Sequence, residues 1–274
     1  MCDLFCVQFI LSVSFTSITL PIYLLFVAVL IKNRHEPVLS SSFFRILVSL
    51  GIADIASMLN TLFLFRLPSR WALLVPPLLR TGQVGVKVAN VGLWALMAVQ
   101  HIGVFLLALN RFMAYLTPIR YRLMWTERTT AKAIILQWTL GFAFSIPVLI
   151  FEQNHYSPDN QTLFYQWADA DTLGAYFNWS IGIIVALSLV LSMMYATIFV
   201  KAYKTSQMIR ACSMKTPDSE RIAFRMTQSG FLSTVTIILL SVLIIARQIS
   251  WFVLKVAMDV NVFYFLFYTL TDIY

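Results

Sequence analysis

The chain alternates long apolar runs with short polar segments. A helix needs about 20 apolar residues to cross a bilayer, because each residue advances it by about 1.5 Å through a hydrocarbon core of about 30 Å. The runs that meet this length lie at residues 9–31, 43–65, 85–116, 131–151, 175–200 and 227–246. A seventh run begins near Asn261 and continues to Tyr274. The pattern predicts an all-α, polytopic membrane protein, with residues 1–274 forming one domain of seven transmembrane helices.

The seventh run is the shortest. Residues 261–274 would extend only about 21 Å as a helix, which is less than the thickness of the hydrocarbon core. We therefore expect a truncated seventh helix, in a chain that is itself a truncated product or a fragment.

The composition indicates that a bilayer, rather than water, is the solvent of this chain. Hydrophobic residues make up 59% and charged residues only 12%, whereas a typical soluble domain is about 25% charged. The net charge of +8 does not indicate nucleic-acid binding, because the basic residues lie between the apolar runs. Their distribution indicates topology instead.

Lys and Arg residues predict which side of the membrane each loop faces. With the N-terminus outside, most of the 20 Lys and Arg residues fall in cytoplasmic loops or at cytoplasmic span ends, as the positive-inside rule requires. The loop at residues 152–174 then faces outward, has no Lys or Arg, and carries the glycosylation sequon that begins at Asn160. A second sequon begins at Asn178, but we expect it to lie too close to the membrane for modification.

Asp54 is an acidic residue in the middle of a predicted span. It lies about 16 Å from the start of that span, near the midplane of the bilayer. A buried carboxylate costs several kcal/mol unless it is paired, so such a residue is a functional candidate. Asp54 could bind a cation, share a proton, or accept hydrogen bonds from Ser49, Ser57 or Asn60. A packing role without any of these functions is the alternative.

The third span carries a polar stripe. Its members follow the helical spacing i, i+3, i+7, i+10 and i+14, and are Lys87, Asn90, Trp94, Met97 and His101. This spacing places them on one face, which predicts either a ligand cavity open to the outside or an interhelical hydrogen-bonding seam. Candidates to face it from the fifth, sixth and seventh spans are Asn178, Trp179, Arg247, Gln248, Trp251, Tyr264 and Tyr268. Trp179 and Trp251 are equally explained as interfacial aromatic residues.

The third span ends at Asn110-Arg111-Phe112, and a basic segment follows it. An arginine at a span end commonly anchors the helix by extending its charge to the headgroups. In this context, we interpret Arg111 as part of a switch on the cytoplasmic face of a seven-span receptor.

Neither an enzyme nor a metal or cofactor site is indicated. The three cysteines (Cys2, Cys6 and Cys212) and the three histidines show no metal-ligand spacing. The sequence has no Gly-rich phosphate loop and no nucleophile motif of the Gly-x-Ser-x-Gly type.

Two segments resemble nematode serpentine chemoreceptors, nearest to serpentine receptor class V within the Srg superfamily. Leu50-Gly51-Ile52-Ala53-Asp54, with Ser41-Ser42-Phe43-Phe44 before it, resembles their second helix. Asn110-Arg111-Phe112, with Pro118-Ile119-Arg120-Tyr121 and Trp125-Thr126, resembles their third helix and second inner loop. The resemblance implies a G-protein-coupled receptor in the plasma membrane of sensory neurons, with a small-molecule or pheromone-like ligand and a heterotrimeric G protein as partner. It also implies that Arg111 is the switch arginine.

The chain departs from the wider receptor class in two ways. Asn110 stands where an acidic residue would pair with the switch arginine, and no cysteine lies at the outer end of the third span or in the loop at residues 152–174. Two alternative functions remain open at this point. One is a membrane transporter or ligand-gated channel with Asp54 as the coupling site, and the other is a truncated receptor product that does not signal.

Overall fold

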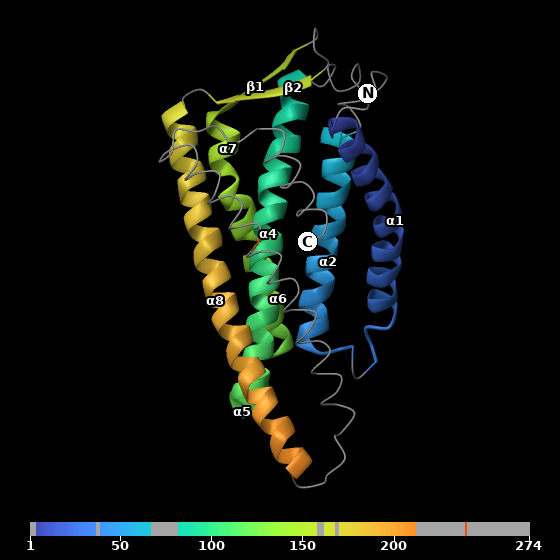
Figure 1. The fold of residues 1–274 in the computed structure, drawn as a ribbon, viewed down its shortest axis with the longest axis vertical. Coiled ribbons are helices and arrows are strands. Elements are labelled where there is room, and N and C mark those ends of the chain that lie inside the picture. The colour runs from blue at the N-terminus through green and yellow to red at the C-terminus, as the bar shows by residue number, and fades with distance from the viewer. Residues whose placement is uncertain are drawn as a thin grey trace. The chain divides into compact units, whose positions relative to one another are not determined.

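The computed structural model describes residues 4–36, 39–66, 82–157, 162–167 and 170–211, together with Leu239. Figure 1 labels the α-helices and strands along this part of the chain. The elements are α1 (Leu4–Lys32), α2 (Ser42–Thr61), the π-helical turn η1 (Leu62–Arg66), α4 (Gly82–Leu116), α5 (Pro118–Met124), α6 (Glu127–Phe144), α7 (Ile146–Phe151), β1 (Glu152–Ser157), β2 (Thr162–Trp167) and α8 (Ala170–Ala211).

Five candidate membrane spans lie within the described residues. They are Val13–Lys32, Ser42–Leu64, Lys87–Leu116, Glu127–Phe151 and Asn178–Lys201. They overlap the first five predicted spans, and the prediction of an all-α polytopic membrane protein is confirmed. The predicted spans at residues 227–246 and 261–274 lie outside the described residues, apart from the helical residue Leu239.

Large apolar side chains remain exposed on the long helices. Examples are Leu25 on α1, Val88 on α4 and Leu189 on α8, each at least 60% exposed. A soluble protein rarely exposes apolar residues over such an extent of its surface. The helices therefore present these faces to lipid, where every backbone N–H and C=O must be satisfied within the helix itself.

Contacts along the chain divide it into two compact units. Unit one comprises residues 1–103 and 130–180, and unit two comprises residues 104–129 and 181–274. The helices α4, α6 and α8 each contribute residues to both.

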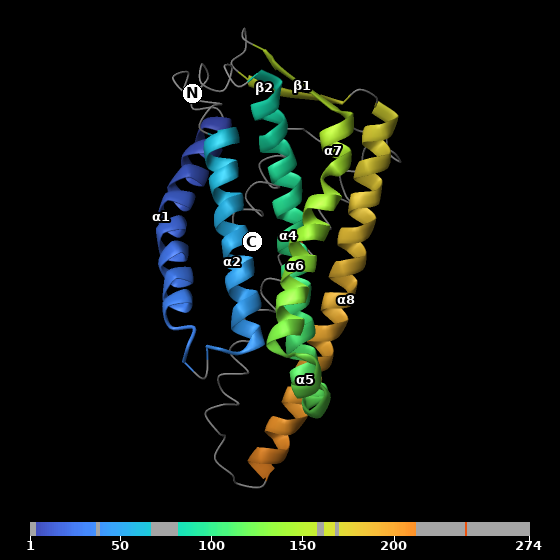
Figure 2. The ribbon, with the colours of Figure 1, turned by 180° about the vertical axis from the view of Figure 1, so that it is seen from behind.

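Glycines permit close helix packing in unit one. A Cβ atom added to Gly51 on α2 would lie 2.6 Å from Val27 Cγ2 on α1, and Figure 2 shows these two helices side by side. A Cβ atom added to Gly141 on α6 would lie 2.3 Å from Val99 Cγ2 on α4. Without a hydrophobic force between helices in lipid, such close contact is a main source of helix association.

The fourth predicted span is broken into α6 and α7 at Ser145. The backbone N–H of Ser145 donates to the carbonyl of Phe142 at 3.1 Å, and its hydroxyl donates to the same carbonyl at 2.7 Å. Pro147 follows and cannot donate a backbone hydrogen bond to the carbonyl four residues earlier. The local i→i−3 bonds at Ser145 therefore interrupt the helix close to this proline.

The loop between the fourth and fifth spans forms a β-hairpin, which the apolar pattern did not predict. Strands β1 and β2 pair antiparallel, from Glu152 opposite Trp167 to Ser157 opposite Thr162. Residues 158–161, which include the sequon residue Asn160, lie outside the described residues.

Candidate functional site

Asp54 is the centre of a three-helix contact in unit one. Its carboxylate accepts a hydrogen bond from the Tyr23 hydroxyl on α1 at 2.6 Å. The other carboxylate oxygen accepts one from Gln100 Nε2 on α4 at 2.8 Å. The two donors supply the compensation that a carboxyl group needs inside a membrane, and they join α2 to the helices on either side of it in sequence.

The partners of Asp54 differ from those that the sequence suggested. Ser49 donates its hydroxyl hydrogen to Gln137 Oε1 instead, at 3.3 Å. Asn60 donates through Nδ2 to the carbonyl of Ala89 at 3.0 Å. Because α2 offers polar groups on several sides, the packing of its neighbours decides which group each one meets.

A second polar chain joins α2, α4 and α6. Trp138 Nε1 donates to Ser49 Oγ at 3.0 Å, and Ser49 Oγ donates in turn to Gln137. Gln137 is fully buried, and its Nε2 donates a hydrogen bond to the carbonyl of Val99 on α4 at 3.0 Å. Each donor thus has an acceptor, which is the condition for burying polar groups away from water.

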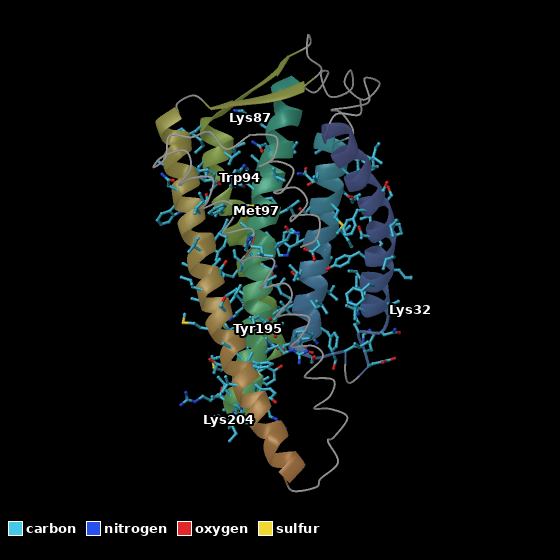
Figure 3. All side chains as sticks on the ribbon, in the orientation of Figure 1. Lys32, Lys87, Trp94, Met97, Tyr195 and Lys204 are labelled. Carbon is cyan, nitrogen blue, oxygen red and sulfur yellow. The ribbon has the colours of Figure 1, made fainter. Side chains whose placement is uncertain are left out.

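The polar stripe on α4 makes packing contacts along its length. Lys87 Nζ reaches the carbonyl of Leu149 on α7 at 3.5 Å, and His101 Nδ1 lies 2.7 Å from the carbonyl of Met97 one turn earlier. Asn90 is buried. Figure 3 shows Lys87, Trp94 and Met97 at successive levels of this helix. The Lys87 contact joins α4 to α7, as in an interhelical seam, whereas the His101 contact lies within α4.

Aromatic rings continue this seam towards α6 and α8. The rings of Trp94 and Tyr176 meet edge to face, with their centroids 5.1 Å apart. The Tyr176 hydroxyl donates to the carbonyl of Phe144 at 3.0 Å, and the two rings lie 5.8 Å apart. The Tyr176 hydroxyl therefore donates to a carbonyl one residue before Ser145, where α6 and α7 are separated.

Other predicted pocket residues are placed differently or not described. Asn178 is exposed on α8, and Trp179 beside it is 67% exposed. Ser180 is the third residue of the sequon that begins at Asn178. It is buried and donates its hydroxyl hydrogen to the carbonyl of Tyr176 at 2.7 Å. The remaining candidates lie outside the described residues and are Arg247, Gln248, Trp251, Tyr264 and Tyr268.

Arg111 lies in unit two and is only partly exposed to solvent. Its Nε atom is buried, and the phenol groups of Tyr121 on α5 and Tyr195 on α8 interact electrostatically with its guanidinium. Asn110 beside it is 1% exposed, whereas Phe112 is partly exposed. A purely snorkelling arginine would extend its charge into the headgroups. Arg111 instead connects α4 with α5 and α8.

The end of α4 is fixed by contacts around this arginine. Lys201 Nζ on α8 donates to the carbonyl of Tyr115 at 2.9 Å, so a cation satisfies one of the last carbonyls of α4. The Trp125 indole N–H lies 3.4 Å from the sulfur of Met113, which ties the chain after α5 back to α4. Figure 3 labels Tyr195 and Lys204 on α8, which lie before and after Lys201 in the sequence.

Sequence reasoning missed Tyr23, Gln100, Gln137 and Tyr195. A signal existed for Gln137, because a lone amide within an apolar span needs a partner in lipid. The same argument applies to Gln100, which precedes the stripe residue His101. Tyr23 and Tyr195 give no such signal, since tyrosine is equally common at membrane interfaces. Within the described residues, no group of three or more His, Cys, Asp and Glu side chains could hold a metal ion.

Comparison with known proteins identifies related receptors. The family described as "Serpentine type 7TM GPCR chemoreceptor Srv" matches residues 12–274. "Serpentine receptor class V-1" of Caenorhabditis elegans is 27% identical over 196 residues, which is 70% of this chain and 62% of that relative. The chain therefore spans less than two thirds of the relative's length. Both matches confirm the resemblance to class V, and neither names the wider Srg superfamily.

Proposed function

The chain belongs to the Srv family of serpentine seven-transmembrane chemoreceptors, and on this premise we propose that it is a chemosensory receptor that signals through a heterotrimeric G protein. It binds a small-molecule or pheromone-like ligand from the outer side of the plasma membrane of a sensory neuron, with its N-terminus outside. Family membership places it in a class of multi-pass membrane receptors rather than in a class of enzymes. A single domain of seven transmembrane helices over residues 1–274 belongs to this proposal.

The observation that carries the proposal is the environment of Arg111. A partly buried guanidinium that interacts electrostatically with tyrosines from two other helices is a charge that can exchange partners when those helices move. In the proposed mechanism, Tyr195 and Tyr121 hold Arg111 in the resting state, and activation releases it towards the G protein. A ligand drives this change only to the extent that it binds the active state more tightly than the resting state.

Substitution of Arg111 by lysine tests this mechanism. Lysine keeps the charge but lacks the planar, multidentate guanidinium, so it cannot reproduce directional hydrogen bonds. We expect Arg111→Lys to reach the cell surface normally and to bind ligand within about tenfold of the wild type. It should nevertheless lose most G-protein activation, because lysine cannot make the directional hydrogen bonds of the proposed switch. A tenfold change in ligand affinity, by comparison, corresponds to only about 1.4 kcal/mol.

The measurement is nucleotide exchange by a purified heterotrimeric G protein added to membranes with matched receptor levels. Basal exchange and exchange with an activating compound from a chemical screen are both recorded. Arg128→Lys is the matched control, because Arg128 is an exposed cation at the start of α6 and should tolerate the change. Unchanged exchange in Arg111→Lys would reduce this residue to a membrane anchor and remove the support for the switch.

The geometry around Asp54 does not favour a transporter with this residue as its coupling site. Both carboxylate oxygens accept hydrogen bonds from protein donors, at 2.6 and 2.8 Å. A coupling ion would have to displace Tyr23 or Gln100. The contact is better explained as one that fixes α1 and α4 against α2.

A further inference from the structure

Helix α5 has an apolar face that is open to its surroundings. Ile119 is 79% exposed and Leu123 is 75% exposed. They are four residues apart and therefore lie on the same side of the helix. Together with Pro118 and Arg122, they line a shallow hollow on the surface.

Two arginines flank this apolar face. A helix rotates by about 100° per residue, so Arg120 and Arg122 lie roughly 80° to either side of the centre of the apolar face around the helix axis. That centre lies midway between the directions of Ile119 and Leu123. Both arginine side chains are exposed. The result is a short helix with two apolar side chains between two cations, which is the arrangement of helices that lie in a membrane interface.

The opposite side of α5 faces the candidate switch. Tyr121 lies roughly 180° from the centre of the apolar face, is only partly exposed, and interacts electrostatically with Arg111. One side of α5 thus interacts electrostatically with the guanidinium while the other is open. A force that holds the open side in place would also fix the position of Tyr121.

We propose that the exposed face of α5 docks onto anionic lipid headgroups of the cytoplasmic leaflet, and that this docking holds Tyr121 against Arg111. Only Thr117 separates α5 from the last residue of α4, so α5 begins at the level where a transmembrane helix leaves the hydrocarbon. The cytoplasmic leaflet is negatively charged and attracts juxtamembrane arginines. Ile119 and Leu123 enter the boundary between headgroups and acyl chains, and Arg120 and Arg122 bind the headgroups.

Lipid fits this surface better than a protein partner does. A stable protein interface buries about 800 Å² on each partner, and the open face of α5 offers two apolar side chains. A lipid surface requires no such area, because electrostatic attraction adds to the burial of a few apolar groups. The exposed cation Lys204 on α8 adds to the positive charge of unit two.

The docking is measured on the full chain in lipid nanodiscs. An environment-sensitive fluorophore is attached at Leu123→Cys, with Cys2, Cys6 and Cys212 replaced by serine. Nanodiscs contain either phosphatidylcholine alone or a mixture with phosphatidylserine. In the anionic nanodiscs we expect blue-shifted emission and quenching by lipids that carry a quencher near the headgroup, and in neutral nanodiscs we expect an emission close to that in water.

Substitutions distinguish the contribution of the arginine charges to docking from that of the apolar side chains. Arg120→Gln or Arg122→Gln should each lower the ratio of docked to undocked helix about fivefold. Arg128→Gln, an equal loss of charge outside α5, should leave it unchanged. Ile119→Gln should reduce docking more than Met124→Gln, because Met124 lies roughly 120° from the centre of the apolar face. Equal fluorescence in neutral and anionic nanodiscs would overturn the proposal, and so would a blue shift that appears only when a G protein is added.

The effect on Arg111 rests on the proposed function and has a separate measurement. Basal nucleotide exchange is compared between neutral and anionic nanodiscs, for the wild type and for Arg122→Gln. We expect anionic lipid to change the exchange rate of the wild type at least threefold and that of Arg122→Gln much less. An unchanged wild-type rate with intact docking overturns the link to Arg111. A wild type that supports no exchange in any lipid contradicts the proposed receptor function, and the fluorescence still decides whether α5 docks.

Discussion

At the scale of single residues, the described polar side chains of unit one work mainly as structural connectors. Asp54, Gln137 and Ser49 each hydrogen-bond across helices. Interhelical hydrogen bonds in membranes contribute about 0.6 kcal/mol on average and up to about 1.7 kcal/mol, because the unfolded chain in the membrane finds other partners. No one of these bonds therefore dominates stability, but together they specify which helix faces meet.

Tyr23→Phe tests the contact at Asp54. Removal of the hydroxyl should lower the free energy of unfolding by about 0.5–2 kcal/mol, measured by thermal unfolding of the detergent-solubilised chain. In an Asp54→Ala background the same substitution should be nearly neutral, because its acceptor is already gone. An equal loss in both backgrounds would show that Tyr23 stabilises the fold through packing alone.

Gly103→Ala tests the close packing beside Gln137. The added Cβ atom would lie 2.6 Å from Gln137 Nε2 and 3.0 Å from Leu50 Cδ1. Overpacking of this kind typically costs about 1–3 kcal/mol, so we expect a clear fall in the unfolding temperature. Gly182→Ala on α8 is the control, because nothing lies within 4 Å of its Cβ position, and alanine favours the helix by up to about 1 kcal/mol. A similar loss in both variants would contradict the packing argument.

At the scale of elements, the hairpin of β1 and β2 gives the loop after α7 a defined form. Its strands pair over six residues each, and the connecting residues 158–161 contain Asn160. The second sequon, which begins at Asn178, lies within a helix and not in a loop, and its residue Ser180 is buried within α8. Glycosylation requires an accessible surface segment, so the two sequons should behave differently.

Expression in a glycosylating cell tests both the sequons and the proposed orientation. A mobility shift on a gel should be removed by a glycosidase and be absent in Asn160→Gln. Asn178→Gln should retain the shift, which makes it the matched control. An epitope tag inserted between Lys215 and Asp218 that antibodies reach on intact cells would contradict the placement of the N-terminus outside.

At the scale of the whole molecule, a receptor must couple an outer ligand site to its cytoplasmic face. The ligand cavity predicted from the α4 stripe would include Asn90, Trp94 and His101, while the predicted candidate Arg247 lies outside the described residues. Trp94 packs against the ring of Tyr176, and His101 hydrogen-bonds to the carbonyl of Met97 within α4. A ligand could act there by changing how these side chains pack, since only differential binding to two states transmits a signal.

Alanine substitutions test the pocket once an activating compound has been found by screening. Trp94→Ala and His101→Ala should each shift its half-maximal concentration by about tenfold or more, a loss of roughly 1.4 kcal/mol of binding, at constant surface level. Asn90→Ala and Arg247→Ala complete the series. Val88→Ala is the control, because Val88 is 62% exposed on the same helix and faces away from the described contacts. Unchanged potency in all four variants would leave the stripe as a packing seam.

The positions of the first five spans and the class of protein that they form could be predicted from the amino-acid sequence alone. In lipid, each helix must satisfy its own backbone and remain apolar over about 20 residues, so its position is a local property of the chain. The segments around Asp54 and Arg111 likewise indicated the receptor family, which the match over residues 12–274 confirms. Local patterns were sufficient for both inferences.

The partners of the polar residues and the form of the loop between α7 and α8 depend on the tertiary structure. The donors to Asp54 lie 31 and 46 residues away in sequence, and the bond between Ser49 and Gln137 spans 88 residues. Which side chains meet over such distances depends on how glycine-lined helix faces pack, and the hairpin depends on pairing between two segments that have no apolar period. The burial of Arg111 beside Tyr195 follows from the same cause, because it requires α8 to lie against the end of α4, where Lys201 binds the carbonyl of Tyr115.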